Sequence, residues 1–346
     1  MPAPPPELSV VIPTIGRRQL LARVLDRLAG QEGTTGDFEV VVVTDANETE
    51  ADAVAGLIEG RPYPARSIAA PRPGASAARN AGIRDARAPL VLFLDDDILP
   101  RPALVARHLE WHRRHSDEGT AVLGRVRWSP ELRVTPFMRW LDRGIQFDYG
   151  GIAGIEAGWG RFYTANVSVK RALLERAGGF DEERLPFGYE DLDLAYRLRD
   201  LGLRLLYNRE ADAEHLHSMD LDFWRRRVRR TAVSERRFTE LHPDVPPYFH
   251  RLYSAAMTRR PARGRGLKLA SVVPPWMPVL GPRVWASVDA FYTQALAPEF
   301  LAAWEAAGEG TDPIDPDLTE RDPSTTPGSP PGRSAGARTT GRFDRA

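Results

Sequence analysis

The 346-residue chain has 47 Lys and Arg residues against 47 Asp and Glu residues, so its formal net charge is zero and predicts no partner. An apolar fraction of 42% and a charged fraction of 27% are typical of a globular protein and argue against collagen-like, wholly disordered and multi-span membrane classes. The absence of cysteine from the sequence excludes disulfides, iron–sulfur clusters, thiolate metal sites and a cysteine nucleophile. Any metal must therefore be held by oxygen and imidazole ligands.

The N-terminal residues and the longest uncharged run of the chain predict where the protein resides. Residues 1–7 lack the basic and apolar regions of a signal peptide, which predicts a disordered N-terminus and a cytoplasmic protein. The longest uncharged stretch, residues 269–282, has 14 residues and four prolines, whereas a membrane-spanning helix needs about 20 apolar residues. We therefore expect no membrane span.

Short β-rich runs alternate with helical patterns between residues 8 and 217. Strands are predicted over 8–12, 38–44 and 90–94, with a helix over 20–28 closed by Gly30 and a small-residue helix over 75–88. This alternation predicts the α/β class, with a mostly parallel sheet covered by helices on both faces. In such sheets ligands bind at the carboxyl ends of the strands.

The later elements are less regular. A strand is predicted over 121–126, an irregular Trp- and Gly-rich passage over 128–160, and helices near Lys170 and Asp191. Residues 218–305 have a basic helical pattern, and residues 306–346 have the Pro, Gly, Ser and Thr content of a disordered tail. Five aromatic residues of the middle region could make stacking contacts with a ligand, but packing in the core is the expected role of most of them: Trp128, Phe137, Trp140, Trp159 and Tyr163.

Three carboxylates, Asp95, Asp96 and Asp97, follow the strand predicted over 90–94. If the strand continued, alternation would point Asp95 and Asp97 to one side and Asp96 to the other. Such a pair suits a hard divalent cation, which prefers oxygen ligands and also takes phosphate oxygens. The alternative is an exposed acidic turn that caps the next element, but the position at the carboxyl end of a strand favours a functional role.

A second acidic cluster, Glu190 and Asp191, opens a predicted helix, where acids are also favoured by the helix dipole. The functional alternative makes Asp191 a general base that reaches a bound hydroxyl. A histidine pair, His215 and His217, follows a strand-like run at 204–207. A neutral imidazole from this pair could complete a metal shell, although such pairs also occur as surface residues.

In this order the three clusters resemble family 2 glycosyltransferases of the GT-A fold, over about residues 7–217. The segment 9–14 resembles their first strand and donor-nucleotide loop, and residues 74–82 resemble their Ala-Arg-Asn segment beside the diphosphate. The triplet at 95–97 is similar to the DxD motif of the family. The stretches 165–166 and 178–181 resemble the part that closes round the transferred sugar.

The resemblance implies a GT-A fold, Rossmann-like, with a mostly parallel sheet flanked by helices. The helical pattern of residues 218–305 adds a C-terminal helical appendage to this fold. It implies an inverting transfer, dependent on Mn²⁺ or Mg²⁺, from a nucleoside-diphosphate sugar to an acceptor hydroxyl. The acceptor region matches no named subfamily, and a glycan or lipid-linked acceptor in the synthesis of cell-envelope glycans or polysaccharides is a hypothesis. Asp191 would be the catalytic base, with Glu190 orienting the base or the acceptor. Asp97 and His215 would bind the metal, with His217 as the alternative ligand. The implied nucleotide-sugar contacts are Pro13, Thr14, Asp45, Arg79, Asn80, Asp95, Asp96 and Asn166.

The segment from Phe223 to Lys268 concentrates positive charge, with twelve Arg and one Lys against three acids. Leu221, Trp224 and Val228 form a narrow apolar stripe beside these arginines. Such a helix can lie on an anionic membrane, with the uncharged stretch 269–282 at the interface, which predicts peripheral association with the cytoplasmic face of the membrane. The alternative is a solvated face neutralised by the acidic clusters, and no motif favours specific binding of nucleic acid.

Two other functions compete with glycosyl transfer. A nucleotidyltransferase would need a Gly-rich loop with an early cation after the first strand, and residues 15–18 are too short for that. A non-catalytic sugar-nucleotide-binding or scaffolding protein would have no need to keep Asp95, Asp97, Asp191 and His215 together. An NAD-dependent Rossmann enzyme is excluded because no GxGxxG follows the first strand.

Overall fold

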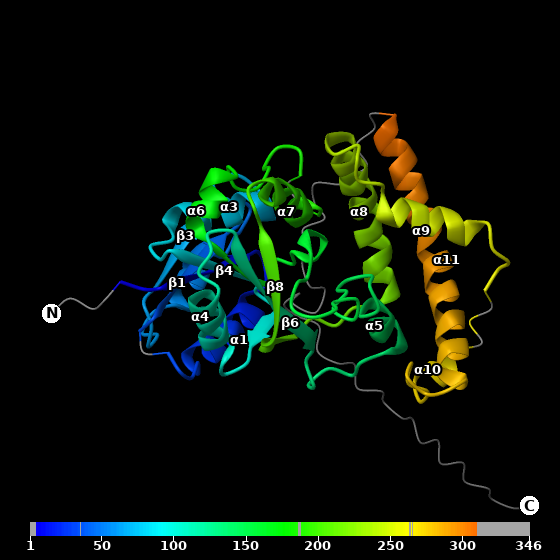
Figure 1. Cartoon of the computed structure of the whole chain (residues 1–346), viewed down its shortest axis with the longest axis horizontal. Coiled ribbons are helices and arrows are strands. Elements are labelled where there is room, and N and C mark those ends of the chain that lie inside the picture. The colour runs from blue at the N-terminus through cyan, green and yellow to red at the C-terminus, as the bar shows by residue number, and fades with distance from the viewer. Residues whose placement is uncertain (1–4, 35, 186–187, 263, 265, 310–346) are drawn as a thin grey trace, which may run out of the picture.

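One eight-stranded sheet forms the body of the protein in the computed structural model, which describes residues 5–34, 36–185, 188–262, 264 and 266–309 (Figure 1). The strands lie in the order β3-β2-β1-β4-β7-β6-β8-β5. Their bounds are β1 Leu8–Thr14, β2 Phe38–Thr44, β3 Ala65–Ala69, β4 Leu90–Leu94, β5 Ile98–Pro100, β6 Thr120–Trp128, β7 Asn166–Lys170 and β8 Arg204–His215.

The first three predicted strands are confirmed as β1, β2 and β4. They are runs of Val, Leu and Ile and are almost entirely buried, as expected of strands covered on both faces. β1 pairs in parallel with β2 and β4, and β2 pairs in parallel with β3. β7 runs antiparallel to β4 and β6, and β5 runs antiparallel to β8, so the second half of the sheet is mixed.

Helices cover both faces of this sheet. α1 and α4 pack on one face through a core that includes Leu25 and Leu109, while α3, α6 and α7 pack on the other through Ala78, Leu174 and Leu194. The predicted helix over 75–88 is shorter than expected, because Ala86 is already extended. The helices of this part are α1 Arg18–Ala29, α2 Ala51–Gly56, α3 Ala75–Asp85, α4 Leu104–Arg114, α5 Pro136–Leu141, α6 Arg171–Arg176 and α7 Glu190–Asp200, with a 3₁₀ turn at Trp159–Arg161.

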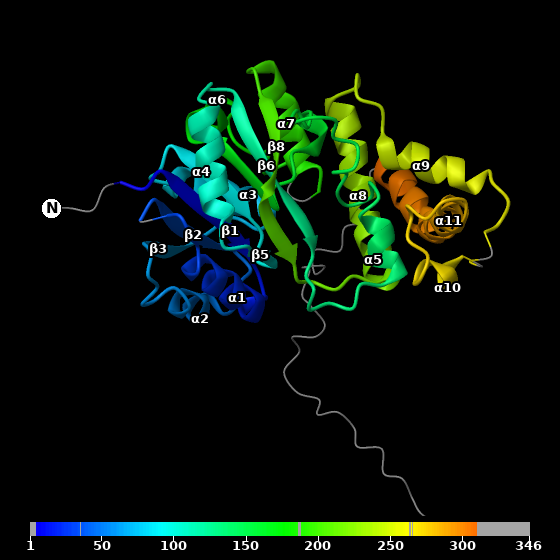
Figure 2. The same cartoon turned by 60° about the horizontal axis from the view of Figure 1, so that its bottom comes forward.

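Four further helices form an appendage beside the sheet (Figures 1 and 2). They are α8 Leu221–Leu241, α9 Tyr248–Met257, α10 Leu267–Ala270 and α11 Leu280–Gly308. They share a hydrophobic core of their own, which α5 joins from the middle of the chain through Phe137 and Trp140. The expectation that most aromatic residues of the middle region pack in the core is confirmed for these two side chains, which are 5% and 2% exposed.

The apolar stripe predicted on the basic helix α8 does not face a membrane. Trp224 and Val228 are 4% and 1% exposed and belong to the core that α8 shares with α5 and α11. The physical reason is that burial against other apolar helices removes these side chains from water as a bilayer would. The prediction that this stripe lies on a membrane is therefore wrong.

The structure describes only a part of the two end segments that were predicted to be disordered. The Glu7 N–H donates to the Asp37 carbonyl at 2.8 Å, so residue 7 is joined to the sheet. Helix α11 continues to Gly308, so residues 306–308 are helical, while residues 1–4 and 310–346 lie outside the described residues. In the part of the chain that the structure describes, no helix is both long and apolar enough to cross a bilayer.

Candidate active site

The carboxyl ends of β1, β2 and β4 meet at one edge of the sheet. The parallel register places Thr14 beside Thr44, and Asp45 and Asp95 follow directly after β2 and β4. Asp45 accepts a hydrogen bond from the Gly74 N–H at 2.7 Å, which fixes the start of α3 against this edge. Gly74 has φ = 111°, a conformation that a residue with a side chain rarely adopts. The sheet edge thus gathers the predicted donor-contacting residues Pro13, Thr14, Asp45 and Asp95.

The acidic triplet forms a turn, because β4 ends at Leu94 and β5 begins at Ile98. The Ile98 N–H donates to the Asp95 carbonyl at 3.1 Å and closes this turn. The predicted alternation is therefore wrong: Asp96 and Asp97 both bind the guanidinium of Arg17, while Asp95 binds Arg79.

Arg17 is a residue of this site that sequence reasoning missed. Its Nη1 lies 2.8 Å from Asp97 Oδ2 and 3.2 Å from Asp96 Oδ1, and its side chain is buried at the start of α1. Thr14 donates to the other oxygen of Asp96 at 2.7 Å. Burial raises the pKa of Asp96 to about 7 despite the nearby guanidinium. The segment after β1 supplied the signal, since an early arginine there can reach the end of the neighbouring strand β4.

Arg79 joins the two acidic clusters that are far apart in the sequence. It lies on α3 with 5% exposure, and its guanidinium reaches Asp95 Oδ1 at 3.0 Å and Glu190 Oε1 at 2.8 Å. Two buried polar atoms of this bridge, Arg79 Nε and Glu190 Oε2, have no hydrogen-bond partner among the residues that the structure describes. Since such atoms are costly to bury unpaired, they favour a ligand or water beside the bridge.

Glu190 and Asp191 form the first turn of α7. The preceding Tyr189 is left-handed, with φ = 64°, which is uncommon outside glycine. Burial, together with the negative charge of Glu190, raises the pKa of Asp191 to about 7. A carboxylate with this pKa can accept a proton near neutral pH, as a general base must.

Asp97 and His215 face each other at the end of β8. His215 Nε2 lies 3.6 Å from Asp97 Oδ2, which is too long for a hydrogen bond. Burial lowers the pKa of His215 and favours its neutral ring. At Asp97 the positive charges that it faces, among them the permanently charged guanidinium of Arg17, outweigh burial and hold the pKa of the carboxyl below the usual range. A neutral imidazole and an ionised carboxylate are suitable ligands for a divalent cation.

The surroundings of Asp97 and His215 bear on whether this pair can bind a metal. The described residues contain no cluster of three or more His, Asp or Glu side chains arranged to hold a metal, so further ligands would have to come from a substrate and water. His217, the alternative ligand, contacts the ring of Phe223, with centroids 5.2 Å apart, and its own ring centroid is 6.4 Å from that of His215. His215 thus approaches Asp97 directly, and His217 stays the alternative ligand.

Asn80 and Asn166 do not face the site. The Asn80 side chain accepts from the Phe180 N–H at 2.8 Å and donates to the Phe180 carbonyl at 2.9 Å, so it holds the loop after α6. Asn166 is fully buried, and its amide donates to the carbonyls of Arg125 and Ala211 while its Oδ1 lies 2.9 Å from His108 Nε2. Because these hydrogen bonds within the fold occupy both amides, the prediction that they contact the donor is not supported.

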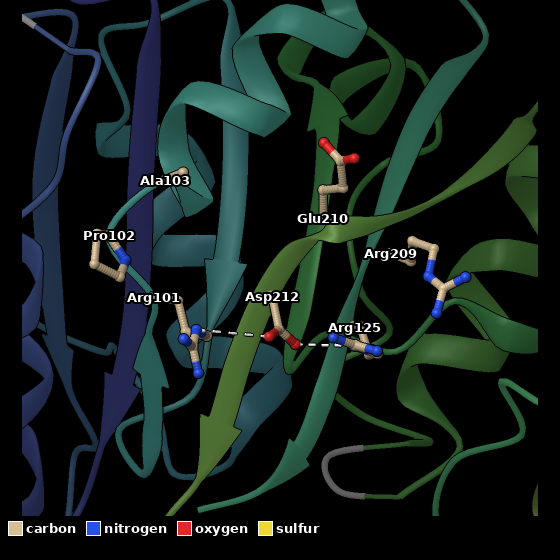
Figure 3. Close-up of a pocket in the computed structure, with 7 residues that line it drawn as sticks. All are labelled: Arg101, Pro102, Ala103, Arg125, Arg209, Glu210 and Asp212. Carbon is tan, nitrogen blue, oxygen red and sulfur yellow. Dashed lines mark hydrogen bonds and ion pairs between the residues drawn. The ribbon is translucent and has the colours of Figure 1, made fainter.

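A separate pocket of about 550 Å³ lies beside β5, β6 and β8 (Figure 3). The buried Asp212 lies at its centre and accepts from Arg125 Nε at 3.0 Å, with Arg101 and Arg127 also within ion-pair distance. Arg101 also reaches Glu214 at 3.0 Å. None of these residues was predicted as part of the site, and their charges are largely balanced within the pocket.

The sequence profile described as glycosyltransferase-like family 2 matches residues 4–234, which is more than half of the chain. The chain belongs to this family. It is 31% identical over 278 residues to validoxylamine A glucosyltransferase of Streptomyces hygroscopicus subsp. jinggangensis, covering 70% of this chain and 62% of that protein. It is 27% identical over 254 residues to the pre-mycofactocin glycosyltransferase of Mycobacterium tuberculosis, covering 69% of this chain and 48% of that protein.

A solved structure confirms the GT-A fold of this family 2 chain. The mannosyltransferase PcManGT of Pyrobaculum calidifontis, in complex with GDP-Man and Mn²⁺, aligns over 90% of this chain and 88% of its own, with a TM-score of 0.53 and 19% sequence identity. The sheet with helices on both faces and the additional C-terminal helices agree with the fold that the sequence predicted. The chain spans about three fifths of the length of its relative from Streptomyces.

Proposed function

We propose that this protein transfers a hexose from a nucleoside-diphosphate sugar to an acceptor hydroxyl with inversion at the anomeric carbon. The observation that carries the proposal is the Arg79 bridge, which joins Asp95 of the donor side to Glu190 of the base side in a family 2 chain. The names of the relatives, a glucosyltransferase and a glycosyltransferase, support the class of reaction.

The donor would bind over the carboxyl ends of β1, β2 and β4. Asp45 and Asp95 would meet the base and ribose, with Pro13 and Thr14 lining the same edge, since all four lie where the parallel strands end. Asp96 accepts hydrogen bonds from Thr14 and Arg17 and so holds both residues at this edge. Arg79 has a guanidinium near the expected diphosphate, where it can also add positive charge.

Asp97 and His215 would hold Mn²⁺ or Mg²⁺ together with oxygens of the donor diphosphate. The two facing acceptor atoms, 3.6 Å apart, fit as two ligands of such a cation. When bound, the cation would neutralise negative charge on the nucleoside-diphosphate leaving group. The chain's own contribution is to hold an ionised carboxylate and a neutral imidazole in one buried place.

Asp191 would take the proton of the acceptor hydroxyl. As that O–H bond breaks, the acceptor oxygen forms a bond to the anomeric carbon from the face opposite the leaving group. The bond between the anomeric carbon and the phosphate oxygen breaks, and its electron pair leaves with the diphosphate. The configuration therefore inverts. Glu190, held by Arg79, would keep Asp191 or the acceptor oriented. The acceptor proposed is a glycan or a lipid-linked saccharide.

The test is thermal stabilisation by UDP-, GDP- and dTDP-hexoses with and without Mn²⁺ or Mg²⁺. A donor at a hundred times its Kd should add about 2.7 kcal/mol of stability. Asp97→Asn should remove the metal dependence, whereas Asp200→Asn, at the exposed far end of α7, should keep it.

Two results would count against the proposal. If no nucleotide sugar raises the melting temperature in the presence of either metal, donor binding fails. If a donor binds but neither hydrolysis nor transfer follows with a panel of glycan and lipid-linked acceptors, the non-catalytic alternative replaces it.

A further inference from the structure

An exposed apolar surface lies at the turn between α10 and α11. Among the described residues eight large hydrophobic side chains are exposed, and five of them fall within residues 269–280. We call these five the apolar tip. Their exposed fractions are 51% for Leu269, 73% for Val272, 81% for Trp276, 65% for Val279 and 53% for Leu280. Clustered exposure of this kind marks an interaction site, whereas scattered apolar residues need no explanation.

The segment that carries the tip is held from beneath. Ala270 and Val273 are buried in the core of the appendage, and the indole N–H of the buried Trp285 donates to the Val273 carbonyl at 2.9 Å. The Gly281 N–H donates to the Met277 carbonyl at 2.9 Å, and a Cβ at Gly281 would come within 2.4 Å of the Pro275 carbonyl oxygen. The fold thus holds this segment so that the five residues of the apolar tip face outward and cannot turn into the core.

The backbone conformation of Val279 also indicates that the surrounding structure holds the apolar tip in place. Val279 has φ = 64°, which is unfavourable for a β-branched residue, at the point where the chain enters α11. Such a conformation persists only where the surroundings enforce it and occurs preferentially at functional sites. Val279 is nevertheless 65% exposed, so its own burial does not repay the strain.

The sequence on either side of the tip carries charge of one sign. Residues 245–288 contain six Arg and one Lys and no Asp or Glu. Arg259, Arg260, Lys268 and Arg283 are exposed in this stretch. An apolar surface that contains a Trp and is flanked in sequence by cationic residues complements an anionic bilayer. Its apolar side chains can enter the interfacial region, and its cations can contact the lipid phosphates.

We infer that the apolar tip docks this protein on the surface of an anionic phospholipid bilayer, without spanning it. Figure 1 shows α10 and the start of α11 at the lower end of the appendage, on the side away from the sheet. The inference rests on the tip and not on the proposed function. It replaces the α8 stripe, which is buried, as the surface that meets the membrane.

The test is co-sedimentation of the full chain with vesicles of phosphatidylcholine alone and of phosphatidylcholine mixed with phosphatidylglycerol. Wild type should bind the mixed vesicles. Trp276→Ala should weaken this binding about tenfold or more, because the indole no longer enters the interface. Lys268→Glu combined with Arg283→Glu should weaken it by a similar factor and make it less sensitive to salt.

The matched control is Tyr248→Ala, which removes an aromatic side chain that is 56% exposed at the start of α9, outside the tip. This variant should bind as wild type does. All variants should keep the melting temperature of wild type, since exposed side chains are changed. Stabilisation by a nucleotide sugar should also be unchanged, which separates this test from the test of the proposed function.

Three outcomes would overturn the inference. One is no binding of wild type to either kind of vesicle. Another is equal binding by wild type and Trp276→Ala. The third is a concentration-dependent dimer that Trp276→Ala dissociates while no vesicle is bound, which would assign the tip to an interface between two copies of the chain.

Discussion

Asp191 lies in the first turn of α7 among several charged and titratable groups, and its pKa is raised to about 7. Because a general base must be deprotonated, we expect kcat to fall as the pH drops through about 7. Asp191→Asn should lower kcat about 10²- to 10⁴-fold with donor binding retained. Initial rates across neutral pH measure both effects. The groups around Asp191 are Glu190, Arg79, Asp95, Tyr163 and Tyr189.

Asp200→Asn, at the other end of α7, is the control for this prediction and should keep the wild-type rate and profile. An unchanged rate in Asp191→Asn would remove Asp191 as the base. A pH profile that is flat through 7 in the wild type would show that the proton leaves by another group.

The residues at the sheet edge also show what a sequence can and cannot give at this scale. Asp95 and Asp97 were found because carboxylates at a strand end are conspicuous. Arg17 was missed because its role depends on β1 and β4 lying side by side, which brings it to Asp96 and Asp97. For Asn166 the sequence could not show that the amide is occupied by hydrogen bonds within the fold, because an amide looks alike in sequence whether it meets a ligand or backbone carbonyls.

At the scale of elements, α8 is joined to α7 by buried polar contacts. The Tyr189 hydroxyl donates to Glu235 Oε1 at 2.5 Å, and the same carboxylate accepts from the Phe249 and His250 N–H groups at the start of α9. Glu235 is fully buried. The appendage thus holds the residue that precedes the proposed base pair.

We therefore expect Glu235→Ala to lower both stability and kcat. Three partly buried donors, the Tyr189 hydroxyl and the Phe249 and His250 N–H groups, would lose their acceptor, at a cost of up to about 1–3 kcal/mol each where water does not replace it. Release of Tyr189 should lower kcat more than it changes KM for the donor, since the α7 turn carries the base. Denaturant unfolding and steady-state kinetics measure the two effects.

Glu240→Ala is the control on the same helix. Its carboxylate is 62% exposed and meets Arg236 at 3.1 Å, so its removal should change the free energy of unfolding by about 0.5 kcal/mol or less. If Glu235→Ala lost stability but kept the wild-type kcat, the contact would be structural only.

At the scale of the whole molecule, two buried histidines beneath the sheet make stability depend on pH. Burial lowers the pKa of His108 to about 4 and that of His112 to about 3. Both rings lie 2.8 Å from the hydroxyl of Ser168 on β7, and His108 also reaches Asn166. Below about pH 6.5 the unfolded chain takes up protons that the folded chain does not, so acid favours unfolding.

The expected result is a loss of stability as the pH falls from about 6.5 toward 4, of about 3 kcal/mol from His108 alone. Urea unfolding at a series of pH values measures it. His108→Gln, which keeps a side-chain amide in place of the ring, should reduce the slope in this window. His115→Gln, at the partly exposed end of α4, should leave it unchanged. Equal slopes in wild type and His108→Gln would contradict the assignment.

Residue type and spacing were enough to predict the main strands of the sheet, helix α1 and the class of this protein. The runs that form β1, β2 and β4 are apolar enough to be buried strands wherever they pack, and the Leu25 face of α1 repeats at helical spacing. The order of the acidic clusters pointed to family 2 before any geometry was known. These are local properties, fixed by residue type and spacing.

Which apolar surface is buried, and which charged side chains pair with one another, depended on the tertiary structure. The stripe on α8 and the apolar residues at 269–280 look alike as sequence, yet α11 covers Trp224 and leaves Trp276 81% exposed. In the same way Arg79 meets Asp95 and Glu190 only because α3 and α7 pack on one face of the sheet. The physical reason is that burial and charge pairing depend on neighbours distant in the chain, and those neighbours are set by packing.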